Sequence, residues 1–445
     1  MRMNKKVLII SYYFPPLGGA GVQRVAKFCK YLPSFGWEPV ILTVKDVEYL
    51  AKDESLTKEI PEEVKVFRSG SFDPLRILFL LKKIFKRKSS KANLSSTEFY
   101  RTHTKERAKF LSWFFFPDNK IGWLPWALVK GFSLCKKENI DLIFSTSPPP
   151  TVHLIAYFLK FLTKKKWIAD FRDLWVGYQY QYYPTFLHKF LKKRAEKLIL
   201  NSVDGIVVVN ERIEKRIKEK NPRTENFKII PNGFDPDDFV FSGRDRTMFC
   251  PYKIVYMGTF NPDCNPEPFF KAWSNLLVKK ELPKDKIKLI HLGLSIGLDM
   301  DGLMRKYDLT EVIEREGYLP HRDALKILTE AGLLLLVVSE AEDTELITTG
   351  KIYEYLYVHK PILAVVPPDG AAASLIKQFN AGQIIAPNDI IGIEKALKSY
   401  YAEFESCRGL IYQAPTISAK DLELFTRKNL TSRLAEFFDE IVEDE

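Results

Sequence analysis

The sequence predicts an α/β protein made of two domains. Short apolar segments typical of buried parallel strands alternate with segments of helical length along almost the whole chain. With 445 residues, the chain is longer than a single hydrophobic core usually organises. We therefore expect two parallel sheets, each covered by helices, in two successive parts of the chain.

The first domain is expected to begin with a strand at 7–13, a glycine-containing loop at 14–21, a helix at 22–35 and a second strand at 38–44. Residues 71–122 interrupt the alternation with a basic and aromatic stretch, which we interpret as a helical insertion. Further strands are expected at 141–145, 167–170 and 205–210.

The chain is expected to leave the first domain around 232–235, where it reads NGFD. The strands of the second domain are expected at 252–256, 288–292, 312–318, 333–338 and 362–366, and its last helices near 397–404. The amphipathic segment 421–441 favours one more helix. We therefore divide the chain into domains 1–237 and 238–420 and a C-terminal segment 421–445.

Composition narrows the class of protein. The five cysteines are scattered and form no CxxC pair, which argues against a disulfide framework and a zinc site and fits a reducing cytoplasm. The apolar run near the N-terminus is short and ends in a proline pair, so we interpret it as a strand and not as a signal peptide. Without a long apolar segment, we expect a soluble or peripheral protein.

Charge is distributed unevenly along the chain. Residues 1–235 hold 43 Lys and Arg against 23 Asp and Glu, whereas the remainder holds 24 against 33. Basic residues alternate with aromatic ones in 79–91, 158–167 and 186–197. This pattern suits an anionic membrane surface, although solvated helix faces would show it as well. No recognition motif for nucleic acid accompanies the charge, so we do not expect a nucleic-acid partner.

The segment 348–368, TTGKIYEYLYVHKPILAVVPP, carries the clearest chemical signal. Thr349 and Gly350 stand where a helix is expected to begin, and free backbone N–H groups at such a start favour an anion. Lys351 and Glu354 are three residues apart and therefore share one face of that helix. An ordinary strand–helix unit that happens to begin with threonine is the alternative.

The succession of motifs resembles the GT-B glycosyltransferases, in particular the retaining enzymes of family 4. The resemblance spans roughly residues 5–435 and rests on the N-terminal strand–loop–helix–strand and on DLIFSTSPPPTVH, WIADFRDLW, VDGIVVVNERI, KIIPNGFDPDDF, KIVYMGTF and the segment 348–368. It implies two Rossmann-like domains facing across a cleft and a C-terminal helix returning to the first domain. It also implies that Glu354 binds the ribose of a nucleotide sugar. The first of the two glutamates that many family members carry eight residues apart falls on Leu346 here, with Glu345, Glu340 or Glu342 in a shifted loop as the alternative.

In the first domain, WIADFRDLW places Asp170, Arg172 and Asp173 just after a buried strand. Open α/β sheets bind ligands at this edge, although the three residues would also brace the loop by pairing with each other. The resemblance implies that they are catalytic, and it places Thr146 where many family members have a histidine.

The loop after the first strand contains Gly18 and Gly19 but lacks the GxGxxG order of a dinucleotide-binding loop. Its glycines serve either a tight turn or close approach of a substrate. The resemblance implies the second role, with both glycines near the phosphates of the donor.

In the second domain, YMGTFNPDCNPEPFF resembles the family's diphosphate-binding unit, with Gly258 and Thr259 at the turn. Many family members neutralise phosphate there with arginine and lysine, whereas this chain offers the uncharged Asn261. The remaining cations for that role are Lys351 and Arg322, the latter with a solvated ion pair to its neighbour Asp323 as the alternative.

We therefore predict a retaining hexosyl- or N-acetylhexosaminyltransferase with UDP- or GDP-sugar as co-substrate and neither a metal nor another cofactor. The expected acceptor is a glycan or a lipid-linked precursor of an envelope polysaccharide. We expect the protein in the cytoplasm, peripherally attached to the inner face of the plasma membrane. The alternatives are a degenerate GT-B protein that binds a sugar nucleotide or a partner transferase, and a nucleotide-sugar 2-epimerase.

Overall fold

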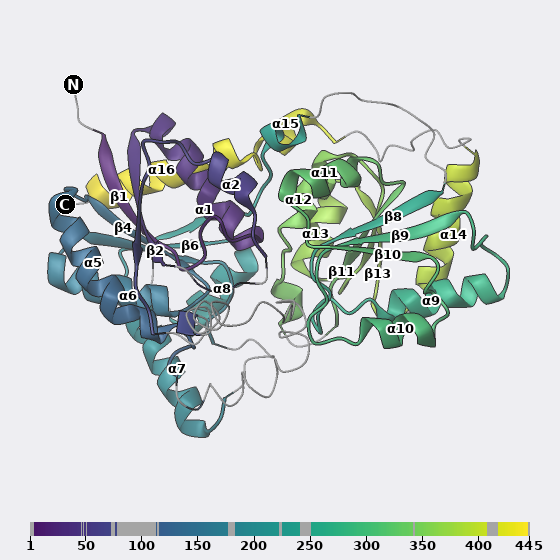
Figure 1. Cartoon of the computed structure of the whole chain (residues 1–445), viewed down its shortest axis with the longest axis horizontal. Coiled ribbons are helices and arrows are strands. Elements are labelled where there is room, and N and C mark those ends of the chain that lie inside the picture. The colour runs from purple at the N-terminus through teal and green to yellow at the C-terminus, as the bar shows by residue number, and fades with distance from the viewer. Residues whose placement is uncertain are drawn as a thin grey trace, which may run out of the picture. The chain divides into compact units, whose positions relative to one another are not determined.

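The computed structural model describes residues 4–443 except 46, 48, 50, 73–75, 78–112, 114, 177–182, 222–224, 241–250, 341–342 and 407–416. The chain divides into two compact units, one of residues 1–232 with 427–445 and one of residues 233–426 (Figure 1). Most of the insertion expected at 71–122 lies outside the described residues. Both units are α/β, as predicted.

Unit 1 contains, among its described residues, a seven-stranded sheet in the order β3-β2-β1-β4-β5-β6-β7. All six pairings are parallel. The strands are β1 Lys5–Ile10, β2 Trp37–Val44, β3 Lys65–Ser69, β4 Leu142–Ser147, β5 Lys166–Phe171, β6 Gly205–Val208 and β7 Phe227–Ile229. The order reverses between β1 and β4, and side chains that follow these two strands meet at one edge, where such sheets bind ligands.

The helices and 3-10 turns of unit 1 are α1 Ala20–Tyr31, η1 Leu32–Phe35, α2 Glu54–Lys58, η2 Ile121–Trp123, α5 Leu124–Lys137, α6 Thr151–Thr163, α7 Phe186–Leu200, α8 Glu211–Lys220 and α16 Arg427–Glu443. Helices α1 and α16 share one core with the Val7 and Ile9 face of β1. Helices α5 and α6 pack together over the opposite face. The contact is close, since a Cβ on Gly131 of α5 would touch both Leu159 of α6 and Leu42 of β2.

The C-terminal helix belongs to unit 1, although the chain reaches it only after completing unit 2. Its apolar face inserts Leu430, Leu434 and Phe438 among the core residues of the sheet. The Phe438 ring lies edge-on to Trp37, with ring centroids 5.3 Å apart. The 3.6-residue spacing of these side chains is the pattern that predicted a helix here.

Unit 2 contains a six-stranded parallel sheet in the order β10-β9-β8-β11-β12-β13 within the described part of the chain. Its strands are β8 Tyr252–Met257, β9 Ile287–Leu292, β10 Ile313–Gly317, β11 Leu333–Val337, β12 Ile362–Val365 and β13 Gly382–Ile385. The helices and 3-10 turns are η3 Pro236–Phe239, α9 Glu267–Val278, α10 Met300–Lys306, α11 His321–Thr329, η4 Thr344–Leu346, α12 Lys351–Tyr357, α13 Ala371–Gln378, α14 Ile390–Ser406 and α15 Ala419–Glu423.

Two apolar cores sandwich the unit 2 sheet. Helices α9 and α14 cover one face, with Trp273 and Leu397 against Ile254 and Leu335. Helices α11, α12 and α13 cover the other. Figure 1 shows the two sets on opposite sides of the strands. Because β8 and β11 are neighbours at the point where the strand order reverses, the end of β8 and the start of α12 belong to one edge.

The units divide at positions that differ from the expected ones by a few residues. The first break follows Asn232 and not 237, because Phe234 forms a β-bridge with Thr426 and η3 packs on α11. The second break follows Thr426 and not 420, since α15 contributes Leu422 to the unit 2 core. The expected helix at 421–441 is accordingly two helices, α15 and α16.

Candidate functional site

In unit 2 the candidate site begins where β8 ends, at Gly258. This glycine has φ 131°, and its carbonyl accepts a hydrogen bond from His291 Nε2 at 3.0 Å. A Cβ at this position would lie 3.0 Å from the Nζ atom of Lys351. The glycine therefore brings the ammonium of Lys351 from the first turn of α12 close to the backbone at the end of β8.

Lys351 is held over an aromatic ring. Its Nζ lies 3.6 Å from the centroid of the Tyr256 ring, which is a cation–π contact. Burial lowers the pKa of Lys351 to about 8. No salt bridge or hydrogen bond of this side chain is found within the described part of the chain. A lysine desolvated in this way gains by binding an anion, because the anion restores the interactions that water no longer provides.

Glu354 lies one turn further along α12 and is almost fully buried. Its Oε1 is 2.7 Å from Nε2 of His321, at the start of α11. The Nδ1 atom of the same imidazole is 3.7 Å from Oδ2 of the buried Asp238 in η3. A carboxylate bound by one imidazole on one oxygen keeps its other oxygen as an acceptor for a ligand hydroxyl.

The remaining unit 2 residues predicted as donor ligands differ in their surroundings. The Thr349 hydroxyl, just before α12, is buried without a hydrogen-bond partner in the structure. Gly350 is the residue preceding α12, a helix of only 7 residues. Thr259 follows Gly258 and is half-buried, and its carbonyl accepts a hydrogen bond from Tyr256. Arg322 is exposed, and no ion pair with Asp323 is present in the described residues.

Asn261, which stands where many family members carry a cation, has a structural role. Asn261 Oδ1 accepts hydrogen bonds from the backbone N–H groups of Asp263 and Cys264, at 2.9 and 3.0 Å. It fixes the turn between β8 and α9. Leu346, at the position of the family's first glutamate, is buried in η4 and provides no carboxylate. Lys351 and Glu354 are therefore the two ionisable groups that the α12 segment contributes to this edge.

In unit 1, Asp170 at the end of β5 is completely buried. Its carboxylate accepts hydrogen bonds from Arg24 Nε and Nη2 of α1, at 3.1 and 3.0 Å, and from the Thr146 hydroxyl of β4, at 2.7 Å. The Arg24 Nη1 atom donates to the Pro231 carbonyl. Asp170 and Thr146 thus lie inside the protein. Their hydrogen bonds join α1, β4 and β5, and their expected catalytic role stays a prediction.

Arg172 and Asp173 lie beyond the end of β5. Arg172 Nε donates to the Ser147 carbonyl at 2.7 Å, and its guanidinium rests on Gly21. A Cβ at Gly21 would lie 2.3 Å from Arg172 Nη1, so only glycine fits there without displacing the arginine. Asp173 is exposed, and no ion pair of its carboxylate is found in the described residues. These two residues, and not Asp170, are the accessible charged pair at this edge.

The backbone of the glycine-containing loop is engaged in hydrogen bonds within the protein. The Gly18 N–H donates to the Ala51 carbonyl at 2.9 Å and is therefore already engaged, while the expected position of Gly18 near the donor's phosphates stays a prediction. Gly19 precedes α1 with φ 107°, and its carbonyl accepts the N–H of Val22. Its positive φ explains the glycine by conformation alone.

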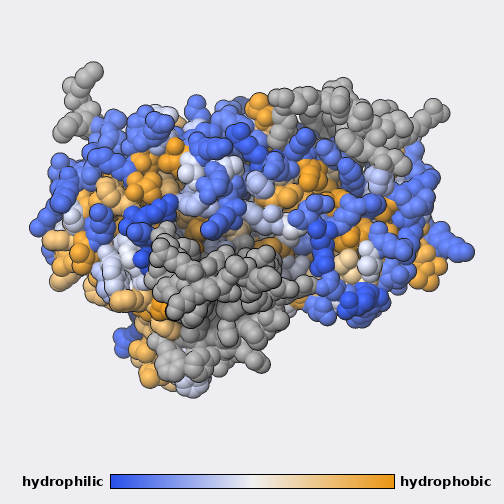
Figure 2. Space-filling model, in the orientation of Figure 1, coloured by the Kyte–Doolittle hydropathy of each residue, from blue (hydrophilic) through white to orange (hydrophobic). Residues whose placement is uncertain are grey.

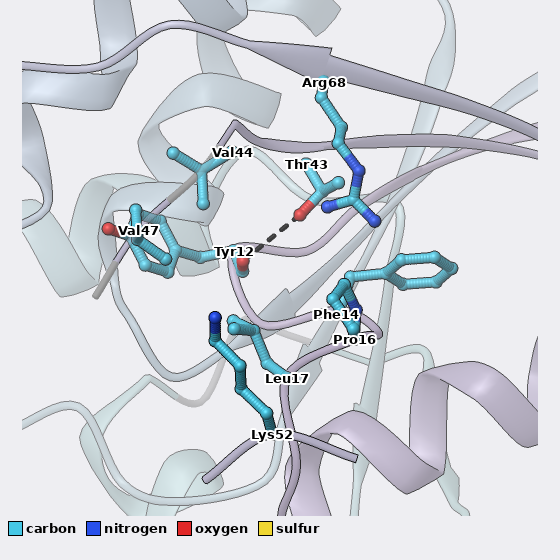
Figure 3. A pocket seen from close by; sticks show the side chains of 9 residues that line it. All are labelled: Tyr12, Phe14, Pro16, Leu17, Thr43, Val44, Val47, Lys52 and Arg68. Carbon is cyan, nitrogen blue, oxygen red and sulfur yellow. Dashed lines mark hydrogen bonds between the residues drawn. The ribbon is translucent and has the colours of Figure 1, made fainter. Parts of the chain in front are cut away.

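A pocket of about 150 Å³ opens beside this loop, at the ends of β1, β2 and β3 (Figure 3). Its walls include the apolar side chains of Phe14 and Leu17, and the cationic side chains of Lys52 and Arg68 approach it from opposite sides. The Thr43 hydroxyl donates to the Tyr12 carbonyl at its base, as the dashed line marks. The pocket offers a cationic, part-apolar surface that the sequence did not reveal.

Arg24 and His321 were also missed. Arg24 falls on the inner side of α1, where a charged residue among Val22, Val25 and Phe28 signals a buried partner. His321 is the first residue of α11, and its relation to Glu354 depends on how α11 and α12 pack. In the described residues no group of three His, Cys, Asp or Glu side chains is placed to hold a metal ion.

Comparisons with known proteins agree with this geometry. Residues 95–238 match the sequence model of Glycosyltransferase Family 4. HepE from Anabaena, solved in complex with UDP and glucose, has a TM-score of 0.66 at 12% identity, with 98% of this chain and 100% of that chain covered. Sucrose-phosphate synthase from Thermosynechococcus elongatus has a TM-score of 0.65 at 14% identity, with 98% of each chain covered.

A TarM variant from S. aureus, solved with Fondaparinux, alpha-GlcNAc-glycerol and UDP, has a TM-score of 0.59 at 12% identity, with 98% of this chain and 100% of that chain covered. Among curated proteins, none matches the chain. The structural similarities show the fold, and the family match covers residues 95–238, all but the last six of which lie in unit 1. The chain therefore has the GT-B fold and resembles Glycosyltransferase Family 4 in this part of its sequence.

Proposed function

We propose that the protein is a retaining glycosyltransferase that moves a hexose or an N-acetylhexosamine from a UDP- or GDP-sugar to a glycan or lipid-linked acceptor of the cell envelope. The observation that carries the proposal is the arrangement of Lys351 and Glu354 on one face of α12, beside the end of β8. One group is a desolvated cation and the other an oriented carboxylate. A nucleoside diphosphate needs both, the cation for its phosphates and the carboxylate for its ribose hydroxyls.

In this proposal, Lys351 meets the negative charge that develops on the diphosphate as the sugar bond breaks. Glu354, oriented by His321, accepts hydrogen bonds from the ribose and fixes the donor. The buried Thr349 hydroxyl has a proton to donate to a phosphate oxygen. One structural neighbour, HepE from Anabaena, was solved with UDP, with UDP and glucose, and with UDP-glucose, which supports a uridine nucleotide as the first donor to test.

The acceptor is assigned to unit 1. The accessible Arg172 and Asp173 and the pocket beside Lys52 and Arg68 suit an acceptor with hydroxyl groups and an anionic group. The basic character of residues 1–235 supports attachment to an anionic membrane surface. No helix in the described part of the chain is long and apolar enough to cross a membrane. Residues 79–91, one of the three basic and aromatic segments that suggest this attachment, lie outside the described residues.

A degenerate GT-B protein that only binds a sugar nucleotide is the second candidate. It is favoured by the engagement of Asn261 in a turn at the position where many family members carry a cation. Lys351 is then the single cation identified beside the end of β8. The two candidates agree on donor binding and differ on transfer.

Thermal unfolding with a panel of nucleotides and nucleotide sugars tests the donor site. A bound ligand at 100 times its dissociation constant adds about 2.7 kcal/mol to the free energy of unfolding, so the true nucleotide should raise Tm measurably. Glu354→Gln should remove most of that rise while leaving Tm without ligand nearly unchanged. An equal rise in Tm for the parent and Glu354→Gln, or no rise in Tm with any nucleotide, would contradict the assignment of the donor site to α12.

A further inference from the structure

Helix α7 exposes an unusual number of large apolar side chains. Phe186 is 84% exposed, and Leu187, Phe190, Leu191 and Leu198 are each at least 41% exposed. Trp113, itself 51% exposed, lies against this helix, with its ring centroid 5.9 Å from that of His188. Single exposed apolar residues are common on proteins, whereas a contiguous group of this size marks a binding surface.

The spacing puts the apolar residues together on one side. Phe186 and Phe190 are one turn apart with ring centroids 6.5 Å apart, and Leu187 and Leu191 repeat the spacing one position later. The side of α7 that faces the protein buries Lys192 and Glu196 and, at the C-terminal end, Ile199 and Leu200. Glu196 accepts a hydrogen bond from the Val176 N–H, which anchors that side. The helix therefore packs by a side of mixed polarity and presents Phe186, Leu187, Phe190 and Leu191 outward.

Basic residues share the exposed side of α7 with these apolar residues. Lys189, Lys193, Arg194 and Lys197 are exposed, and the Arg194 guanidinium lies 5.3 Å from the centroid of the Phe190 ring. No salt bridge joins any of the four to a carboxylate in the described residues. The one acidic residue of the helix, Glu196, is buried. We call the exposed side chains of Trp113 and of residues 186–198 the α7 surface, and Figure 2 shows hydrophobic and hydrophilic residues next to each other over the end of α7.

We propose that the α7 surface docks on a lipid bilayer that carries anionic headgroups. Aromatic and leucine side chains lie well at the boundary between headgroups and acyl chains, and lysine and arginine beside them bind lipid phosphates. A second copy of the chain fits less well, because a twofold interface on this surface would place the four cations of one copy beside those of the other. Docking by the α7 surface adds a membrane partner to the proposed function. Its link to a lipid-linked acceptor rests on that proposed function.

Flotation with vesicles tests docking without any transfer reaction. The full-length protein should bind vesicles of phosphatidylcholine with phosphatidylglycerol, bind phosphatidylcholine alone much less, and detach at high salt. Phe186→Ser with Phe190→Ser, and separately Lys189→Gln with Lys193→Gln and Arg194→Gln, should each lower the partition coefficient about tenfold or more. All five side chains are exposed, so the fold should survive, and unchanged Tm checks this.

Matched variants on unit 2 are the controls. Val278→Ser with Ile391→Ser removes two exposed apolar residues, and Lys271→Gln with Lys280→Gln and Lys395→Gln removes the same charge. Both controls should bind anionic vesicles like the parent. Equal loss in the controls, parent-like binding by the α7 variants, or equal binding of the parent to both vesicle types would overturn the proposal. So would a dimer that Phe186→Ser with Phe190→Ser converts to a monomer, since α7 would then be a subunit interface.

Nucleotide binding separates this proposal from the proposed function. The α7 variants should keep the parent's Tm rise with the nucleotide, because α7 and the α12 segment belong to different units. Vesicle binding without any nucleotide effect would leave docking intact and reject the transferase. A Tm rise with a nucleotide but no vesicle binding would reject docking and leave the proposed transferase intact.

Discussion

At the scale of residues, the donor site depends on the hydrogen bond between Glu354 and His321. Removing the carboxylate with Glu354→Gln should cost roughly 2–4 kcal/mol of transition-state stabilisation, seen as a lower kcat/KM for the donor. His321→Leu should act through the same carboxylate and raise the KM of the donor with a smaller change in kcat. His321→Gln, which keeps a donor to Glu354, should restore part of the loss. An unchanged donor KM in His321→Leu would contradict the positioning role.

If Lys351 is the proposed phosphate cation, the rate of the reaction should depend on pH. Its pKa of about 8 means that it is protonated below that pH and neutral above it. Because only the ammonium neutralises phosphate, kcat/KM should fall as the pH rises through about 8. Lys351→Arg, which stays charged, should move the decline to higher pH, and Lys351→Met should be poorly active throughout. A parent profile that stays flat well above pH 8 would show that Lys351 is not the phosphate cation.

Some of these residues could be predicted from the sequence and others could not. Lys351 and Glu354 were found because local spacing alone places them on one helical face. Asp170 and Arg172 looked alike, since both follow the same strand, but β5 buries the first and releases the second. That difference follows from the end of β5 at Phe171, which leaves Arg172 outside the sheet, and from Arg24, which is 146 positions away from Asp170 in the chain. Contacts of such separation leave no local signal.

At the scale of elements, the ion pair of Arg24 and Asp170 joins α1 to β5. Both side chains are completely buried, so Asp170→Asn leaves a guanidinium without its countercharge. The expected cost is about 3–5 kcal/mol in the free energy of unfolding. The exposed pair of Lys218 and Glu214 within α8 is the control, and Lys218→Gln should cost about 0.5 kcal/mol or less. Urea unfolding of the two variants checks the contrast, and similar costs would contradict it.

Central strands were easier to predict than edge strands. The expected strand at 333–338 matches β11, which is buried along its whole length and reads LLLLV. Strands β3, β7 and β13 lie at sheet edges, are only partly buried, and were not predicted. Their weaker apolar pattern follows from having a neighbour on one side only. The expected strand at 7–13 also ran past β1, because Tyr12 is buried in a loop and not in the sheet.

At the scale of the whole molecule, α16 ties the C-terminus to unit 1 and leaves unit 2 as a continuous segment. Phe438→Ala should therefore destabilise unit 1 by about 3–5 kcal/mol, because the ring fills a site between Trp37 and Phe144. Hydrogen exchange should rise in β1, β4 and β5 and stay unchanged in the unit 2 strands. The nearby exposed Leu424→Ala is the control, with an effect of about 0.5 kcal/mol or less. Faster exchange in both units alike would contradict this division.

The most direct test of the account is transfer of a labelled sugar. The purified protein is incubated with UDP- and GDP-linked hexoses and N-acetylhexosamines, anionic vesicles and extracted envelope glycolipids. The account predicts release of nucleoside diphosphate that depends on the acceptor, with the label moving into the lipid or glycan fraction, and a loss of roughly 30-fold or more in Glu354→Gln. Binding of a nucleotide sugar with neither release nor transfer for any donor would contradict it and leave a protein that only binds.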